Sequence, residues 1–213
     1  MKPERLIVLE TEGWARLDAA SKSAFEALLE NLRRAGVALL RRGDDAAVDA
    51  FERSIADAND LSNSITRWEN RWYQSNLVEH YPDGVSARAK AVVKKAEAMT
   101  PDDYRALLAR RAKAQQCHAA LAALADAAIT LSCPGPAPLW PGDVPGQPLA
   151  PRPTGDSVFN SASSMLFAPA VTMPLMSVGG LPVGVQLIGQ QHEDARMTAL
   201  ARWMLGAVPS VVA

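Results

Sequence analysis

The sequence predicts an α/β fold in which helices flank one mixed β-sheet. Short aliphatic and β-branched runs alternate with longer stretches of helical period, a pattern typical of α/β proteins. Two such runs follow one another closely near the C-terminal end, as in an antiparallel hairpin, and this makes the sheet mixed. The chain has 213 residues, of which 48% are hydrophobic, enough to bury a core. We therefore expect a single α/β domain over residues 1–213.

Five short apolar runs are the predicted strands. Each is rich in aliphatic or β-branched side chains, which favour a pleated, buried backbone. In chain order they are residues 5–10, 37–40, 127–131, 169–174 and 183–188. The pair Gly179-Gly180 lies between the last two runs and predicts the tight turn of a hairpin.

Apolar residues at helical spacing predict the helices. The first helix follows Asp18 and stops at Gly36, since glycine readily ends a helix. Another begins at Thr100-Pro101, because a capping hydroxyl, a proline at the first helical position and Asp103 together form a start signal. The remaining predicted helices cover residues 48–58, 61–77, 89–96 and 193–204, and the one that starts at 100 reaches about residue 125. The middle of the chain is therefore predicted to be mostly helical.

Residues 132–153 form a predicted proline-rich loop. Eight of the fifteen prolines of the chain fall there, a density that no helix or strand tolerates. Loops of this length inside a domain are usually functional or are linkers, and the flanking strands favour a loop that crosses one domain. After it, Thr154 and Asp156 can cap a short helix that extends to Phe167.

Three aromatic residues, Trp68, Trp72 and Tyr73, occur at helical spacing in the middle of the chain. They could form an aromatic pocket. Aromatic residues at this spacing more often pack in a core, and we expect the core position here.

Charge and cysteine content exclude several classes of function. The 22 basic and 23 acidic residues give a net charge of −1, without the broad positive surface that binds nucleic acid or an anionic membrane. Cys117 and Cys133 show no metal-ligand spacing, and no run approaches the roughly 18 apolar residues of a membrane span. We expect a cytoplasmic protein without a metal or a cofactor, which binds neither nucleic acid nor membrane.

The known catalytic motifs are missing. There is no G-x-S-x-G elbow and no glycine-rich phosphate loop, and His192-Glu193 lacks the second histidine of a zinc helix. The run Ser161–Ser164 could supply a nucleophile, but a serine needs a positioned base. No lysine follows Lys113, so we expect these hydroxyls to be structural.

The C-terminal third carries a series of short motifs in a fixed order. They are Asp126-x-x-Ile129-Thr130, the Pro134–Pro138 run, Thr154-Gly155-Asp156-x-x-Phe159-Asn160, the Pro169–Pro174 run, the Gly180–Gly189 run and Asp194-Ala195-Arg196. This series resembles the C-terminal part of amidase signature family hydrolases, and the run Gly180–Gly189 (GLPVGVQLIG) is its most specific element. The preceding strands and helices are similar to that family too, so the resemblance extends over the whole chain and implies the C-terminal half of that fold.

The resemblance implies hydrolysis of a carboxylic amide by a serine nucleophile, a second serine in a cis peptide and a lysine. In that family these groups belong to the N-terminal half, which has no counterpart in this sequence. We therefore assign no catalytic residue to this chain, and whether it is an enzyme by itself stays open. The implied ligand is a small-molecule amide, bound together with the absent catalytic half, and no cofactor is implied.

By resemblance, four residues of the 154–167 segment would line the acyl side of the substrate channel. These predicted substrate-binding residues are Thr154, Phe159, Asn160 and Ser163. A purely structural role for them is equally open. The chain also departs from the family pattern, with Thr130-Leu131 in place of Thr-Pro and with Phe167-Ala168 where relatives often have glycine before Pro-Ala. The second change puts a bulky ring where backbone could otherwise approach closely.

Two functional hypotheses follow. The first is the C-terminal segment of an amidase whose catalytic half lies on a longer parent or on a separate chain. The second is a non-catalytic truncated paralogue, or an interaction module that associates with another chain. Half of a mixed sheet would expose an edge and an apolar face, so both hypotheses predict association with a partner chain or a second copy.

Overall fold

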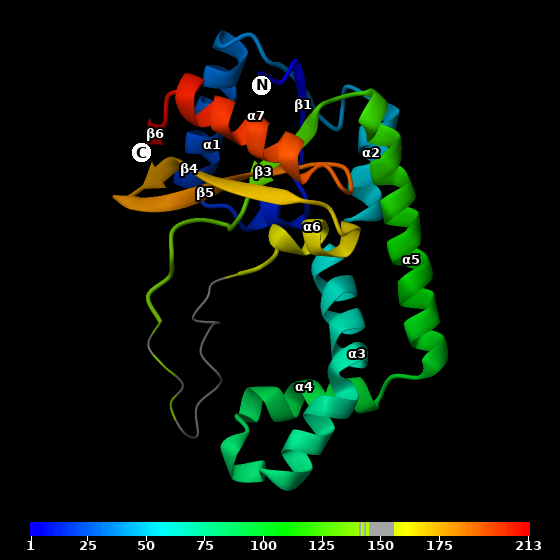
Figure 1. The fold of residues 1–213 in the computed structure, drawn as a ribbon. Coiled ribbons are helices and arrows are strands. Elements are labelled where there is room, and N and C mark those ends of the chain that lie inside the picture. The colour runs from blue at the N-terminus through cyan, green and yellow to red at the C-terminus, as the bar shows by residue number, and fades with distance from the viewer. Residues whose placement is uncertain (141, 143, 145–155) are drawn as a thin grey trace.

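Six strands form one mixed sheet in the computed structural model, which describes residues 1–140, 142, 144 and 156–213 (Figure 1). The strand order across the sheet is β2-β1-β3-β5-β4-β6. The strands are β1 (Arg5–Val8), β2 (Ala38–Leu40), β3 (Ala127–Leu131), β4 (Ala170–Val178), β5 (Leu181–Ile188) and β6 (Val211–Val212). β1 runs parallel to β2 and β3, whereas β5 runs antiparallel to both β3 and β4, so the predicted mixed α/β sheet is confirmed.

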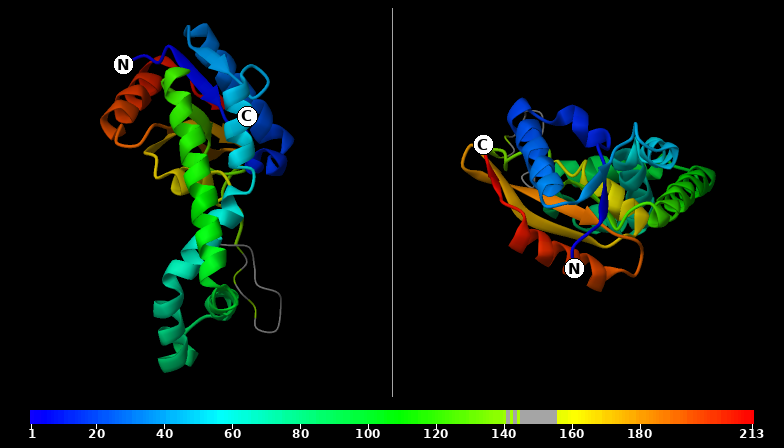
Figure 2. Two further views of the ribbon diagram at one scale, coloured as in Figure 1. Left: turned by 90° about the vertical axis from the view of Figure 1, so that its right-hand side faces the viewer. Right: turned by 90° about the horizontal axis from the view of Figure 1, so that it is seen from above.

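Helices lie on both sides of this sheet (Figure 2). They are α1 (Ala19–Arg34), α2 (Ala46–Ser54), α3 (Ala58–His80), α4 (Ala87–Glu97), α5 (Pro101–Ala120), α6 (Asn160–Leu166) and α7 (Asp194–Ala207). Short 3-10 turns cover Glu12–Arg16, Pro82–Gly84 and Leu121–Ala123. The start signals act as expected, because Asp18 accepts a hydrogen bond from the Ser21 N–H and Thr100 forms a capping box with Asp103. Among the described helices, none combines the length and apolar character needed to cross a bilayer.

Several predicted boundaries are wrong. The helix predicted over 48–58 ends at Ser54 as α2, and the one predicted over 61–77 already begins at Ala58 as α3, because the backbone leaves helical geometry between Ile55 and Asp57. α6 begins at Asn160 rather than at an Asp156 cap, since the Asp156 carboxylate accepts the N–H of Val158 in a turn ahead of the helix. Thr154, the other predicted cap, lies outside the described residues.

The last hairpin is longer than predicted. β4 continues beyond Pro174 because the register shifts between Met173 and Met176, which leaves the proline out of the ladder with β5. The strand β6 is not among the predicted strands, because its two residues are too few to show a periodic pattern.

Two apolar clusters pack against the sheet, and β1 belongs to both. Leu6 and Val8 join a cluster with α1 and α7, while Ile7 and Leu9 join a second cluster with α2, α3, α5 and α6. All four residues are 2% exposed or less. The central strands are therefore buried on both faces, as their uninterrupted apolar sequence indicates.

The helices α3, α4 and α5 extend from the sheet as a long arm (Figures 1 and 2). The last buried residue of α3 is Ile65, and beyond it Trp72 and Tyr73 are 81% and 67% exposed. The expectation that these two aromatic residues pack in the core is wrong, because α4 packs on the distal part of α3 but, like the other described elements, leaves these two rings exposed. Trp68 does find a partner, since its ring stacks on Tyr104 of α5 at 5.5 Å.

Asp126, just before β3, joins three parts of the chain. Its carboxylate accepts the N–H groups of Glu4 at 2.7 Å and Arg5 at 3.1 Å, and it forms an ion pair with Arg196 of α7 at 2.6 Å. Partial burial alone would raise the pKa of Asp126, but these hydrogen bonds and the guanidinium outweigh it and hold the pKa below its usual value. The carboxylate thus stays charged where β1, β3 and α7 meet.

Candidate functional site

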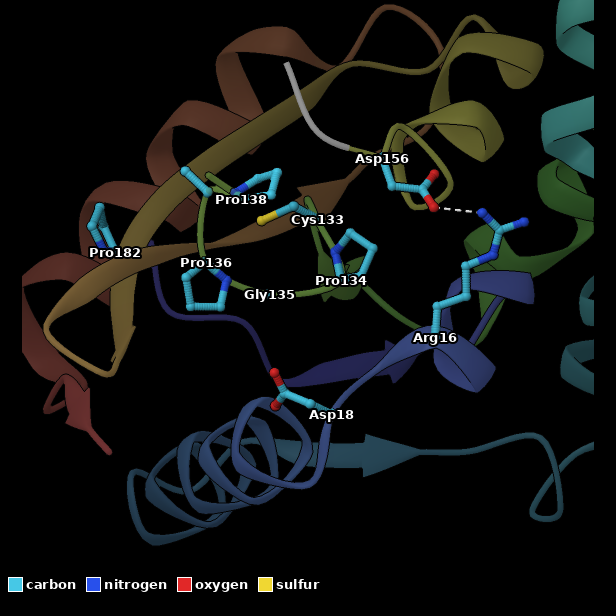
Figure 3. Close-up of a pocket in the computed structure, with 10 residues that line it drawn as sticks. Arg16, Asp18, Cys133, Pro134, Gly135, Pro136, Pro138, Asp156 and Pro182 are labelled. Carbon is cyan, nitrogen blue, oxygen red and sulfur yellow. Dashed lines mark hydrogen bonds and ion pairs between the residues drawn. The ribbon is translucent and has the colours of Figure 1, made fainter. Parts of the chain in front are cut away.

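A pocket of about 500 Å³ opens where the loops that follow β1 and β3 meet (Figure 3). The two strands are parallel, so their carboxyl ends reach the same edge of the sheet, the usual place for a ligand in α/β proteins. The lining residues are Arg16, Asp18, Cys133, Pro134, Gly135, Pro136, Ala137, Pro138, Asp156 and Pro182. Four stretches that are separate in sequence, 16–18, 133–138, Asp156 and Pro182, thus build one site.

The loop after β1 is held by a buried carboxylate. Glu52 of α2 is 3% exposed and accepts the backbone N–H of Glu10 at 2.7 Å and of Thr11 at 3.1 Å. Burial raises the pKa of Glu52, although the two N–H groups act in the opposite direction. Thr11 has φ 54°, a backbone conformation that L-residues rarely adopt, so this anchorage keeps a strained turn in place.

Further contacts fix the same loop against α3 and α6. Glu12 accepts the backbone N–H of Asn59 at 2.8 Å, and the Asn59 side-chain oxygen accepts the hydroxyl of Ser161 at 3.0 Å. A Cβ atom on Gly13 would come within 2.6 Å of the Phe159 ring, so only glycine fits there. The pocket wall that contains Arg16 is therefore a rigid part of the structure.

The pocket contains charges of both signs. Arg16 forms an ion pair with Asp156 across the pocket (Figure 3). Asp18 caps α1, and its Oδ1 atom accepts the Ser21 N–H at 2.6 Å. Its Oδ2 atom would lie 3.6 Å from a Cβ atom at Gly135, so the Asp18 carboxylate faces the backbone after β3. Cys133, whose thiol is free, lines the same space.

The predicted substrate-binding residues lie next to this pocket, and the three that are described do not line it. Phe159 is fully buried, and its carbonyl accepts a hydrogen bond from Gln186 at 3.2 Å. Asn160 begins α6 and is exposed, while Ser163 is 8% exposed and donates its hydroxyl to the Asn160 carbonyl. Thr154 lies outside the described residues. A contact of these four residues with substrate stays a prediction.

Neither Arg16 nor Asp18 is among the predicted site residues, although Asp18 is named as the start of the first helix. The signal that could have found them is their position after the first predicted strand, because polar residues that follow parallel strands gather at one sheet edge. The residues that line the pocket opposite them are more than 100 positions away in sequence, so no local sequence pattern predicts this contact.

The serines and histidines do not form a catalytic pair in the described part of the chain. Ser161 donates to Asn59 and to the Ser157 carbonyl, and no described serine hydroxyl is hydrogen-bonded to a lysine or histidine. His118 is 4% exposed and packs on Phe51 at 5.3 Å. Burial lowers the pKa of His118 to about 4, so its ring is neutral at pH 7. A group of residues able to hold a metal ion is likewise absent from the described positions.

Comparisons with known proteins agree on the fold. No family model matches the chain. The 2-amino-5-chloromuconic acid deaminase of Comamonas testosteroni is 28% identical over 199 residues, covering 88% of this chain and 40% of the deaminase. A solved amidase structure superposes with a TM-score of 0.77 at 21% identity, covering 98% of this chain and 46% of the amidase.

A bacterial aryl acylamidase of the amidase signature family superposes with a TM-score of 0.65 at 12% identity, covering 98% of this chain and 44% of that enzyme. The chain thus spans less than half the length of these proteins. It has the fold of the C-terminal half of amidase signature enzymes, as the sequence resemblance implies.

Proposed function

We propose that this chain, which has the fold of the C-terminal half of amidase signature enzymes, forms one wall of an amide-binding pocket, while the attacking groups come from outside residues 1–213. The ligand is a small-molecule carboxylic amide. The reaction is hydrolysis of its C–N bond by a Ser-Ser-Lys centre on a partner polypeptide or on another part of a longer chain. We place the protein in the cytoplasm, where its two free cysteines stay reduced.

The observation that carries this proposal is a pocket without an attacking group. The pocket lies at the carboxyl ends of β1 and β3, yet its described lining contains no serine, lysine or histidine. A nucleophile needs a positioned base. The thiol of Cys133 has only the Ser132 hydroxyl, at 3.9 Å, as a hydrogen-bond partner among the described residues. This supports a wall and not a complete catalytic centre.

Hydrolysis assays on the purified chain test where the attacking group lies. We expect the chain alone to release no 4-nitroaniline from 4-nitroacetanilide above the rate in buffer. Turnover that disappears in Ser163→Ala, Ser164→Ala or Cys133→Ala would place the attacking group within this chain and would overturn the proposal.

A protection experiment tests whether the pocket binds amides. Methyl methanethiosulfonate is neutral and small, and it converts the Cys133 thiol to a mixed disulfide with release of methanesulfinate. In a Cys117→Ala background, we expect millimolar hexanamide to slow this reaction at least twofold, whereas hexane-1-sulfonate should not. An unchanged rate with hexanamide would rule out this pocket as the amide site.

The second candidate function, an interaction module that associates with another chain, is favoured by the arm. Trp72, Tyr73 and Tyr81 are 81%, 67% and 66% exposed, and exposed apolar surface often marks an interface. Under this hypothesis sedimentation velocity would show a complex that Trp72→Glu and Tyr73→Glu together disperse. Association that survives both substitutions would exclude the arm as the interface.

A further inference from the structure

The charged residues that line the pocket do not balance. Arg16 and Asp156 form an ion pair and neutralise one another, and the remaining charged residue of the described lining is Asp18. The nearest lysine along α1, Lys22, places its ammonium group over the Trp14 ring at 5.0 Å from the centroid, so the aromatic ring engages that cation. Among the described lining residues, Asp18 thus supplies the one negative charge without an ion-pair partner.

Asp18 uses one of its oxygens for the fold and keeps the other for a ligand. Oδ1 accepts the Ser21 N–H, whereas Oδ2 accepts no hydrogen bond from any described residue. The N-terminus of α1 carries a positive partial charge of about half a unit, which offsets only part of the full negative charge of the carboxylate. Gly135 leaves Oδ2 uncovered, because a Cβ atom there would lie in van der Waals contact with this oxygen, at 3.6 Å.

The other walls offer acceptors and few donors. Four of the ten lining residues are prolines, Pro134, Pro136, Pro138 and Pro182, and proline has a backbone carbonyl but no N–H. A ligand carboxylate in this pocket would therefore find few hydrogen-bond donors besides the Arg16 guanidinium, which is already paired with Asp156, and would meet the Asp18 carboxylate. An ammonium group would find that carboxylate and backbone carbonyl oxygens, and its alkyl chain could lie on the proline rings.

We propose that the pocket selects amides which carry a positively charged amino group, and that Asp18 binds this group through Oδ2. The inference rests on the proposed function for the amide part of the ligand, and it adds the charge of the substrate. Asp18 acts as a specificity-determining residue and takes no part in bond cleavage.

The thiol of Cys133 allows a direct measurement of the charge preference. We would compare 2-aminoethyl and 2-sulfonatoethyl methanethiosulfonate, which are similar in size and opposite in charge, in the Cys117→Ala background. Each rate is divided by the rate of the same reagent with 2-mercaptoethanol, which removes intrinsic reactivity. We expect the cationic reagent to react at least fivefold faster at Cys133, because Asp18 and Cys133 line the same pocket and a unit charge there attracts a cation even in a wet environment.

Two matched variants distinguish the effect of Asp18 in the pocket from the effect of the net charge of the protein. Asp18→Asn and Asp45→Asn each remove one negative charge from a helix N-cap, and asparagine caps a helix as well as aspartate does. Asp45 is not part of the described pocket lining. Asp18→Asn should lower the cation preference at least threefold, and Asp45→Asn should leave it unchanged. A wild-type ratio of one or below, or an equal fall in both variants, overturns the inference.

A protection experiment with two amides distinguishes a failure of this inference from a failure of the proposed function. We expect 6-aminohexanamide to protect Cys133 from methyl methanethiosulfonate at lower concentration than hexanamide, with the difference lost in Asp18→Asn. Equal protection by both amides would overturn the charge selection alone. If neither amide protects while the cationic reagent is still favoured, the assignment of the pocket to amides fails and the charge selection stands.

Discussion

The sheet and the arm use the same helical periodicity for different purposes. Around the sheet, α1 buries Phe25, Leu28 and Leu29 completely against the strands. In the arm, α3 buries no residue beyond Ile65, and α4, which packs on it, buries only Val93 and Ala96. Burial of a whole face stabilises the first region, whereas the second has few buried residues and is also held by capping, ion pairs and the Trp68–Tyr104 stack. An apolar stripe in a sequence therefore indicates a surface available for packing and does not show that another element covers it.

The largest expected difference between the two regions comes from truncating one aromatic residue in each. Phe25→Ala removes a fully buried ring and should lower the free energy of unfolding by about 3 to 5 kcal/mol, because a cavity remains. Trp72→Ala removes an exposed ring and should change it by less than about 0.5 kcal/mol. Urea unfolding followed by circular dichroism measures both values. Similar losses would mean that the arm is packed as tightly as the sheet.

His118 lies where the arm joins the rest of the protein, so its protonation should make the stability of both regions depend on pH. Its pKa is about 4 in the folded protein, against an ordinary value of 6.5, so the unfolded chain binds the extra proton between these values. Stability that is complete above pH 6.5 should fall by roughly 3 kcal/mol as the pH drops to 4. The raised pKa of Glu52 acts oppositely, because its contribution to stability decreases as the pH rises above 4.5.

A variant isolates the histidine from Glu52. His118→Phe keeps a ring beside Phe51 and removes the titration, so subtracting its unfolding free energy from that of the wild type at each pH leaves the His118 contribution. We expect that difference to change between pH 7.5 and pH 4.5. A constant difference would show that burial does not suppress protonation of this ring.

The capping box of α5 should stabilise the arm locally. Thr100→Ala removes the hydroxyl that accepts the Asp103 N–H at 3.2 Å and should cost about 1 kcal/mol, while Thr100→Ser should cost much less. Hydrogen exchange measures the outcome, with faster exchange expected in the first turns of α5 and little change in β3. Equal acceleration in both elements would mean that arm and sheet unfold as one unit.

The smallest effect concerns Phe167, which ends α6 with φ 54° and lies under the guanidinium of Arg111 at 4.7 Å. Variants Phe167→Gly and Phe167→Ala both lose that contact, so they differ mainly in the cost of a left-handed backbone. Glycine should be the more stable by about 1 kcal/mol. At the exposed helical position Ala106 of the arm the preference should reverse, with Ala106→Gly less stable by a similar amount. Thermal unfolding of the three variants and the wild type tests whether glycine is the more stable residue at position 167 and the less stable one at position 106.

Sequence patterns predicted the sheet better than the arm or the pocket. The strand at residues 127–131 coincides with β3, because a strand buried on both faces must be apolar throughout. For Trp72 and Tyr73 the pattern located the helix and failed on burial, which depends on whether another element lies opposite.

The pocket was the least predictable part from the sequence. The contact between Arg16 and Asp156 joins residues 140 positions apart, and only the folded sheet brings them together. The motif at 154–160 did indicate the neighbourhood, since Asp156 lines the pocket and Phe159 supports the loop at Gly13. The motif could not show which of its side chains face the cavity and which face the core.

The contacts of the Asp126 carboxylate with β1 and α7 also constrain the order in which the protein assembles during synthesis. The carboxylate meets Arg5 and Glu4 once β3 has been made, but its ion-pair partner Arg196 follows 70 residues later. Contacts between such distant segments form late, because loop closure must come first. A nascent chain released from the ribosome before α7 has been translated therefore keeps Asp126 without its cation, and β4 and β5 keep apolar surface that α7 would cover.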